Sequence, residues 1–234
     1  ATPIPRSLAM VTYGDLDCSV IDELPPGRTP ITTTLIDTDR REAVIRRVGA
    51  ACGNGRQAYW VCTAIEESDS LDLEAAEATR DYLGEALPEV RIGMVHGRMK
   101  APEKAEMMAN FKSGFIQLLV ATTVIEVGVD VPNASLMIID NAERLGLAQL
   151  HQLRGRVGRG VVESHCLLLY RQPLSETARE RLQVMQQTHD GFVIAEADLR
   201  IRGPGELLGT RQTGMAQFRI ARLPEHESLL IEAQ

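Results

Sequence analysis

The sequence predicts an α/β fold: a parallel β-sheet covered by helices on both faces, followed by a C-terminal helical hairpin and a loop. Apolar runs alternate with helical patterns as far as Tyr170, and several of these runs are apolar on both faces. Such strands belong to parallel sheets, because the crossover helices shield both sides. After Tyr170 the apolar runs stop and two helical patterns follow, which predicts the hairpin.

The strands are expected, in chain order, at residues 31–36, 58–63, 91–95, 116–121, 136–140 and 165–170. The helices are expected at residues 39–52, 71–87, 102–112, from about 146 onward, 175–187 and 191–200.

Several residue types predict where these elements begin and end. Asp39 is expected to cap the first helix, with Glu42 three residues on at the capping-box position. Ser175 is expected to cap the first helix of the hairpin, and Gly114 to end the helix that begins near Pro102. We therefore divide the chain into residues 1–28, an α/β domain over 29–172, and the hairpin and loop over 173–234.

Composition sets limits on function. The 234 residues carry a net charge of −7, which argues weakly against a nucleic-acid-binding protein. Arginines nevertheless gather in residues 143–160 and 200–222, so either a C-terminal basic face or ordinary solvated helix faces would account for them. Cys62 and Cys166 lie in apolar runs and are expected in the core, which fits a reducing compartment. No apolar run is long enough to span a bilayer, and a cytoplasmic location is expected.

The strongest chemical signal is Gln152-Leu153-Arg154-Gly155-Arg156-Val157-Gly158-Arg159-Gly160. Arginine presents a planar fork of donors suited to phosphate oxygens, and glycine allows close approach of the backbone. The pair Arg156 and Arg159 therefore favours a polyphosphate ligand over a plain basic turn. We expect both guanidinium groups at the sheet edge where strands end. The spacing resembles Q-x-x-G-R-x-G-R, motif VI of the superfamily-2 helicases.

A second signal precedes it. The strand expected to end at Ala121 continues into Thr122-Thr123 and then Gly128-Val129-Asp130, which resembles motif V of the same helicases. The resemblance implies that Thr122 and Thr123 contact the nucleic-acid backbone. It also implies that Gln152, Gly128 and Asp130 lie near the nucleotide.

Three weaker signals keep the order of the helicase motifs. Residues 1–6 resemble motif III, which closes the first motor domain, and residues 57–62 resemble motif IV. Val95-His96-Gly97-Arg98-Met99 resembles motif IVa, and this implies that Gly97 and Arg98 contact DNA. His96 alone would more often be structural than catalytic.

The tail is the most discriminating stretch. Residues 195–214 resemble the coupling motif shared by the RecG family of DNA helicases and the transcription-repair coupling factor Mfd, and Gly-Pro-Gly-Glu-Leu-Leu-Gly-Thr-Arg-Gln-Thr-Gly at 203–214 is nearer to RecG. Carried over by position, the polar sites of that motif are Arg181, Arg202 and Gln212. This motif is the part of the family that converts motor closure into movement along duplex DNA.

One helicase element, the G-x-x-x-x-G-K-[ST] phosphate loop, is not found in the sequence. Residues 136–140 imitate a Walker B strand, but without a phosphate loop we read Asp140 as a structural acid at a strand end rather than a magnesium ligand. The phosphate and Mg²⁺ ligands of ATP are thus expected mainly from a first motor domain outside this chain.

The resemblance implies a RecA-like second motor domain of a RecG-type bacterial helicase that remodels forks and Holliday junctions. ATP would bind between the two motor domains, and Arg156 and Arg159 would contact it, with Arg159 aimed at the γ-phosphate. The chain by itself is expected to be inactive, and the enzyme monomeric. Two alternatives are an Mfd-like translocase, and a non-catalytic DNA-binding module that keeps the helicase shape.

Overall fold

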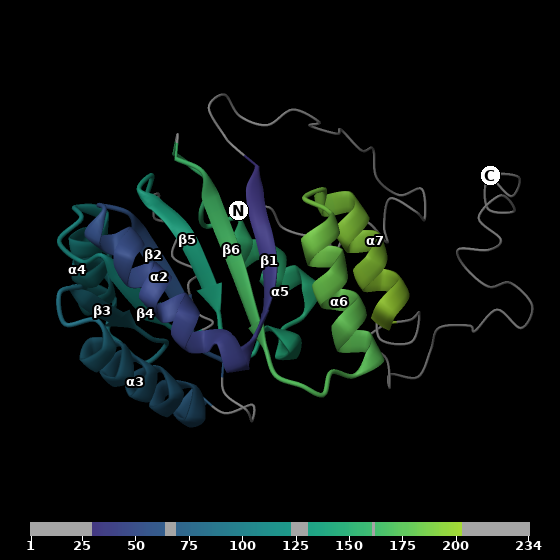
Figure 1. Ribbon diagram of the computed structural model, residues 1–234, viewed down its shortest axis with the longest axis horizontal. Coiled ribbons are helices and arrows are strands. Elements are labelled where there is room, and N and C mark those ends of the chain that lie inside the picture. The colour runs from purple at the N-terminus through teal and green to yellow at the C-terminus, as the bar shows by residue number, and fades with distance from the viewer. Residues whose placement is uncertain (1–29, 64–68, 123–130, 161, 203–234) are drawn as a thin grey trace, which may run out of the picture.

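The computed structural model describes residues 30–63, 69–122, 131–160 and 162–202 of the chain. Among these residues the chain alternates between strands and helices up to Tyr170 and is helical afterwards (Figure 1). The elements in chain order are β1 (Ile31–Asp37), a 3-10 turn (Thr38–Arg40), α2 (Arg41–Gly53), β2 (Gln57–Val61), α3 (Asp69–Ala86), β3 (Ile92–Val95), α4 (Ala101–Lys112), β4 (Leu118–Ala121), β5 (Ala134–Ile139), a 3-10 turn (Ala142–Arg144), α5 (Leu147–Arg154), β6 (Ser164–Tyr170), α6 (Glu176–Gln187) and α7 (Gly191–Arg202).

The six described strands form one sheet in the order β1-β6-β5-β2-β4-β3, and every pairing between them is parallel. Strands that pair in parallel need long crossovers, and the connections β1–β2, β2–β3, β3–β4 and β5–β6 each carry a helix. The expectation of a parallel sheet covered by helices is therefore confirmed, and each of the six strands lies within a few residues of its expected position.

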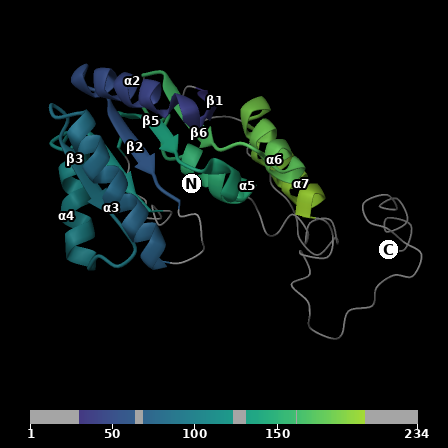
Figure 2. The same ribbon diagram turned by 60° about the horizontal axis from the view of Figure 1, so that its bottom comes forward.

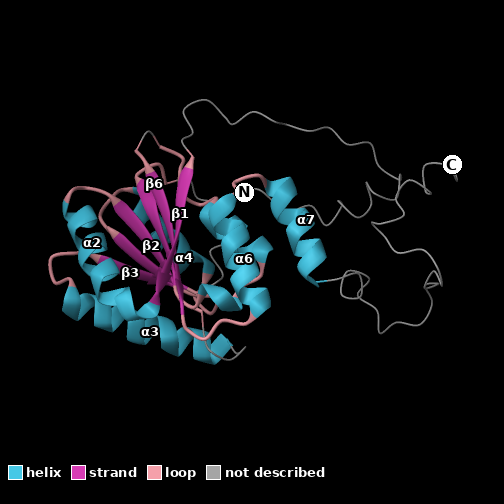
Figure 3. Ribbon diagram, turned by 45° about the vertical axis from the view of Figure 1, so that its right-hand side comes forward, coloured by secondary structure: helices cyan, strands magenta, loops and turns pink. Residues whose placement is uncertain are grey.

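Alternate side chains of the strands enter two separate cores. On one face Trp60, Val120 and Ile138 pack with α2 and α3. On the other face Tyr59, Leu119 and Met137 pack with α4, α5 and the two hairpin helices. Figure 3 shows the strands between the two helical layers. β2, β4 and β5 are buried on both faces, which is the reason that their sequences read as continuous apolar runs.

The hairpin does not stand apart from the sheet. Its buried side chains Leu182, Met185, Ile194 and Ala197 belong to the same core as α5 and β6. Figure 2 shows α6 and α7 beside α5, beyond the β1 edge of the sheet. The Ser175 side chain accepts a hydrogen bond from the Ala178 backbone N–H at 3.2 Å, so the predicted cap of α6 is confirmed.

The expected cap at Asp39 is wrong. The helical segment begins earlier than expected, with the 3-10 turn Thr38–Arg40, so the capping position falls on Asp37. Its carboxylate accepts the Asp39 backbone N–H at 3.0 Å. Gly114 follows α4 at a φ of +80°, as expected for the residue after a helix end, because a Cβ is disfavoured there.

Candidate functional site

The arginine-rich segment forms a turn fixed by its own backbone. α5 ends at Arg154, and the Arg156 backbone N–H donates to the Leu153 carbonyl at 3.0 Å, which continues the winding for one more turn. Gly158 then takes a φ of +77°, a left-handed conformation that favours glycine. The alternation of glycine and arginine therefore shapes a tight turn between α5 and β6.

Gly160 brings this turn against the segment that leads into β5. A Cβ on Gly160 would lie 2.4 Å from the Pro132 carbonyl oxygen, too close for any side chain. The lack of a side chain at Gly160 thus allows two backbone segments of the protein to pack closely. Because Pro132 lies two residues before β5 and Gly160 lies four residues before β6, both segments meet at the edge where these strands begin. The expectation that the two arginines lie where strands end is wrong for this reason.

Arg156 and Arg159 are both half-buried, and Gln152 on α5 is exposed. Arg156 has no ion pair or side-chain hydrogen bond with any residue among those the structure describes. Its guanidinium group is therefore not paired with any carboxylate of the described residues. Gly128 and Asp130, the other two residues expected at the nucleotide, lie outside the described residues.

Arg154 has the opposite environment, although it stands in the same segment. It is 2% exposed, and its guanidinium group donates to the carbonyls of Met185 at 2.7 Å and Thr188 at 2.9 Å. It also contacts His151 Nδ1 at 3.0 Å. Burial lowers the pKa of this guanidinium from its ordinary value, since desolvation disfavours the charge. Arg154 therefore fastens α5 to the end of α6 and contributes nothing to a basic surface.

Arg181 makes a second tie between the hairpin and α5. From α6 it donates to the Leu145 carbonyl at 2.9 Å and the Glu143 carbonyl at 3.1 Å, in the segment just before α5. Arg154 and Arg181 thus join α6 to the segment from Glu143 to the end of α5. Of the other two residues predicted for the coupling motif, Gln212 and the side chain of Arg202 lie outside the described residues.

The residues expected to contact DNA lie at the opposite edge, where β3 and β4 end. Gly97 and Arg98 follow β3 and are exposed, while Thr122 follows β4 and is only 4% exposed. Lys104 on α4 donates to the Gly97 carbonyl at 2.9 Å and so fixes this loop to the helix. Thr123 lies outside the described residues.

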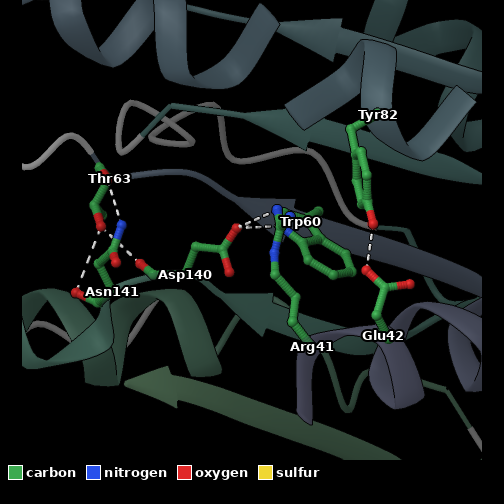
Figure 4. A network of polar contacts seen from close by, with 7 residues as sticks. All are labelled: Arg41, Glu42, Trp60, Thr63, Tyr82, Asp140 and Asn141. Carbon is green, nitrogen blue, oxygen red and sulfur yellow. Dashed lines mark hydrogen bonds and ion pairs between the residues drawn. The ribbon is translucent and has the colours of Figure 1, made fainter. Parts of the chain in front are cut away.

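Asp140 ends β5 at this same edge and is held within the protein (Figure 4). Its Oδ2 atom accepts from Trp60 Nε1 at 2.8 Å and from Arg41 at 3.0 Å. The Arg41 guanidinium lies 5.3 Å from the centroid of the Trp60 ring, within cation–π range. The structural role expected for Asp140 thus agrees with the geometry, because its carboxylate is already engaged by an indole and a guanidinium.

No group of three or more metal-ligating His, Cys, Asp or Glu side chains occurs in the part of the chain that the structure describes. Within that same part, no helix combines the length and the apolar character needed to cross a bilayer.

Comparison with known families places the chain. Residues 39–161 match the helicase conserved C-terminal domain, and the chain belongs to that family. Residues 188–233 match the C-terminal part of domain 3 of ATP-dependent DNA helicase RecG. The particular member that the chain resembles from end to end is therefore RecG, and its fold is the RecA-like fold of helicase C-terminal domains.

Individual relatives agree with this placement. RecG of Escherichia coli K12 is 67% identical across 100% of this chain, and RecG of Thermotoga maritima is 49% identical across 98%. The chain spans 34% of the length of the former and 30% of the latter. A solved structure of RecG bound to a three-way DNA junction is 45% identical, with a TM-score of 0.75, and covers 98% of this chain and 29% of its own. Dbp5 of S. cerevisiae shares the fold alone, at 13% identity and a TM-score of 0.53.

The sequence alone does not predict the internal hydrogen bonds of Arg154, Arg41 and Lys104. Arg154 stands between two residues of a recognisable motif, so the sequence groups its charge with a possible basic surface. Its buried neighbours Leu150, His151 and Leu153 on α5 were the available signal, since an arginine on the apolar side of a short helix must find internal partners.

Proposed function

We propose that this chain is the second motor domain of an ATP-dependent DNA helicase of the RecG type. The turn 155–160 carries the proposal. The hydrogen bonds of Arg154 hold it on one side and the contact of Gly160 with Pro132 on the other, and Arg156 has no carboxylate partner among the residues that the structure describes. A rigid backbone that presents guanidinium groups is suited to a phosphate that is absent from the domain itself.

In this proposal Arg156 and Arg159 bind phosphate oxygens of ATP, with Arg159 directed at the γ-phosphate. Guanidinium groups there stabilise the charge that develops during phosphoryl transfer. Gln152, Gly128 and Asp130 complete this side of the nucleotide site. The Asp140 carboxylate accepts from Trp60 and Arg41, so it does not fit a Mg²⁺ ligand. We therefore assign the phosphate loop and the metal ligands to another motor domain.

We propose that the opposite edge of the sheet binds DNA through Gly97, Arg98, Thr122 and Thr123. Nucleotide and DNA would then lie at the two ends of the same strands. Arg181, Arg202 and Gln212 would couple nucleotide-driven motion to movement along DNA. The bonds of Arg154 and Arg181 support this coupling, because they join α6 to the end of α5 and to the segment just before α5.

The substrate we propose is branched DNA such as a stalled fork or Holliday junction, in the bacterial cytoplasm. Support comes from the RecG structure bound to a three-way DNA junction. We propose the same three-part division as before: residues 1–28 close the first motor domain, 29–172 form the second, and 173–234 form the coupling region. The enzyme would act as a monomer. No observation favours the Mfd-like translocase or the non-catalytic module over this function.

The test is the DNA-stimulated ATPase rate of the full-length protein with Arg159→Ala. We expect a fall of about 10³-fold or more, as for other arginine fingers, with junction binding unchanged. Arg46→Ala, on an exposed arginine of α2, is the control and should keep the full rate. Normal turnover by Arg159→Ala would remove this residue from the role, and DNA-stimulated ATPase from the isolated 234-residue chain would contradict the two-domain site.

A further inference from the structure

Among the described residues, the β1 and β6 half of the sheet is less deeply buried than the rest on the face that carries α2. On this face Thr32 is exposed and Thr34, Ile36, His165 and Leu167 are half-buried, although Leu169 is fully buried, whereas β2, β4 and β5 are buried throughout. Ile36 and Leu167 pack partly against the core formed with α2 and α3. In Figure 1 α2 lies over β5 and β2, and no described helix lies in front of β6 and β1.

A groove runs along the β1 and β6 half of the sheet, beside α2. It encloses about 410 Å³ and has an apolar floor that includes Ile36, Leu136 and Leu167. Its wall is a stripe of α2 residues spaced three or four apart, of which Ala43 and Ala51 are small and leave room above the sheet. Parallel sheets are normally covered on both faces, and no helix of the described residues covers this strip.

Three arginines, Arg40, Arg47 and Arg56, line the groove, and no aspartate or glutamate is among its lining residues. His165 also lines it, and its ring lies 4.0 Å from the Glu163 carboxylate. Arg40 and Arg47 are exposed and seven residues apart, which places them on one side of the helical segment. Neither forms an ion pair with another residue of the described ranges. The groove thus combines an apolar floor with a cationic rim.

We infer that this groove is a docking site for an acidic segment of the same polypeptide, from the part that lies outside these 234 residues. The segment lays apolar side chains on Ile36 and Leu167 and pairs its carboxylates with Arg40 and Arg47. The apolar floor favours a protein segment over a nucleic-acid backbone, which would place charged phosphates on it. The relatives are about three times as long as this chain, since it spans 34% of them, so the polypeptide offers such a segment at high effective concentration.

The test uses the full-length protein with Arg40→Lys and Arg47→Lys, which keep the charge and supply amines for carbodiimide coupling to neighbouring carboxylates. Arg46→Lys is the matched control, since Arg46 is exposed on the same helix but does not line the groove. We expect R40K and R47K to give a cross-link to an acidic segment outside the 234 residues, at a yield independent of protein concentration. Mass spectrometry identifies the linked peptides.

Three results would overturn the inference: cross-links confined to carboxylates of this chain, a concentration-dependent link to a second copy, or a yield no higher than that of R46K. A second measurement is hydroxyl-radical oxidation of Ile36 and Leu167. The charge reversals R40E and R47E together should raise it about tenfold, which corresponds to a loss of about 1.4 kcal/mol of docking free energy. R46E should leave oxidation unchanged, and equal oxidation in all three proteins would contradict docking. The ATPase rates of the same proteins, measured in parallel, test the proposed helicase function independently of docking.

Discussion

The two edges of the sheet use arginine in opposite ways. At the edge where the strands end, Arg41 is paired with Asp140 at 3.0 Å and lies over the Trp60 ring. At the edge where β5 and β6 begin, Arg156 has no such partner among the described residues. Arg154, two residues away from Arg156, is buried and bound to backbone carbonyls. Arginine content alone therefore does not mark a ligand site, because internal partners decide which guanidinium groups remain available for a ligand.

After Arg159→Ala, the largest effect should come from Arg156→Ala in the full-length protein. We expect the DNA-stimulated ATPase rate to fall by about 10²- to 10³-fold, because a charge that contacts phosphate in the transition state is lost. The free energy of unfolding should change by no more than about 0.5 kcal/mol, since no described internal bond is broken. Steady-state kinetics check the ATPase rate, and urea unfolding checks the free energy of unfolding. A large loss of stability with normal kcat would place Arg156 with Arg41 as a structural residue.

Asp140→Ala should do the reverse. It leaves the buried Trp60 N–H without its acceptor and Arg41 without its carboxylate, which together should lower the free energy of unfolding by about 3 kcal/mol. Trp60 is the single tryptophan, so its fluorescence reports urea unfolding of the 234-residue chain directly. Asp140→Asn, which keeps an acceptor for the indole, should lose less. Equal stability of Asp140→Ala and the parent chain would deny the network any structural role.

Arg154→Met should lower the free energy of unfolding by about 2 kcal/mol. The methionine fills much of the volume, but the Met185 and Thr188 carbonyls lose their donor. Because the lost bonds join α5 to α6, hydrogen exchange of α6 amides should speed up more than that of β2 amides. Uniform change across both elements would show that Arg154 does not hold the hairpin specifically.

The smallest effect concerns two buried thiols. Burial raises the pKa of Cys52 to about 11 and that of Cys166 to about 12, while the unfolded thiols ionise near 9.0. Their stabilising contribution is therefore complete below pH 9 and is lost as the pH rises toward 11 and 12. At pH 10 each thiol should account for about 1 kcal/mol of lost stability relative to pH 8. Urea unfolding at both pH values checks this, and Cys52→Ala with Cys166→Ala should reduce the difference.

The sequence by itself determined the order and type of the elements. Six apolar runs became six parallel strands, and Ser175 and Gly114 mark helix boundaries as expected, because capping and left-handed turns depend on local chemistry. Asp39 failed as a cap because a 3-10 turn moved the helix start to a neighbouring acid, a shift of a kind that local pattern does not fix.

Only the tertiary structure decided which polar side chains are occupied and at which edge they lie. Arg154 and Arg156 are two positions apart in a single motif, and nothing local separates them. The partners of Arg154 come from residues 185 and 188, and the contact of Gly160 comes from Pro132, both far along the chain. Burial and pairing depend on segments brought together by folding, so the availability of a charge is a property of the packed molecule and not of its motif.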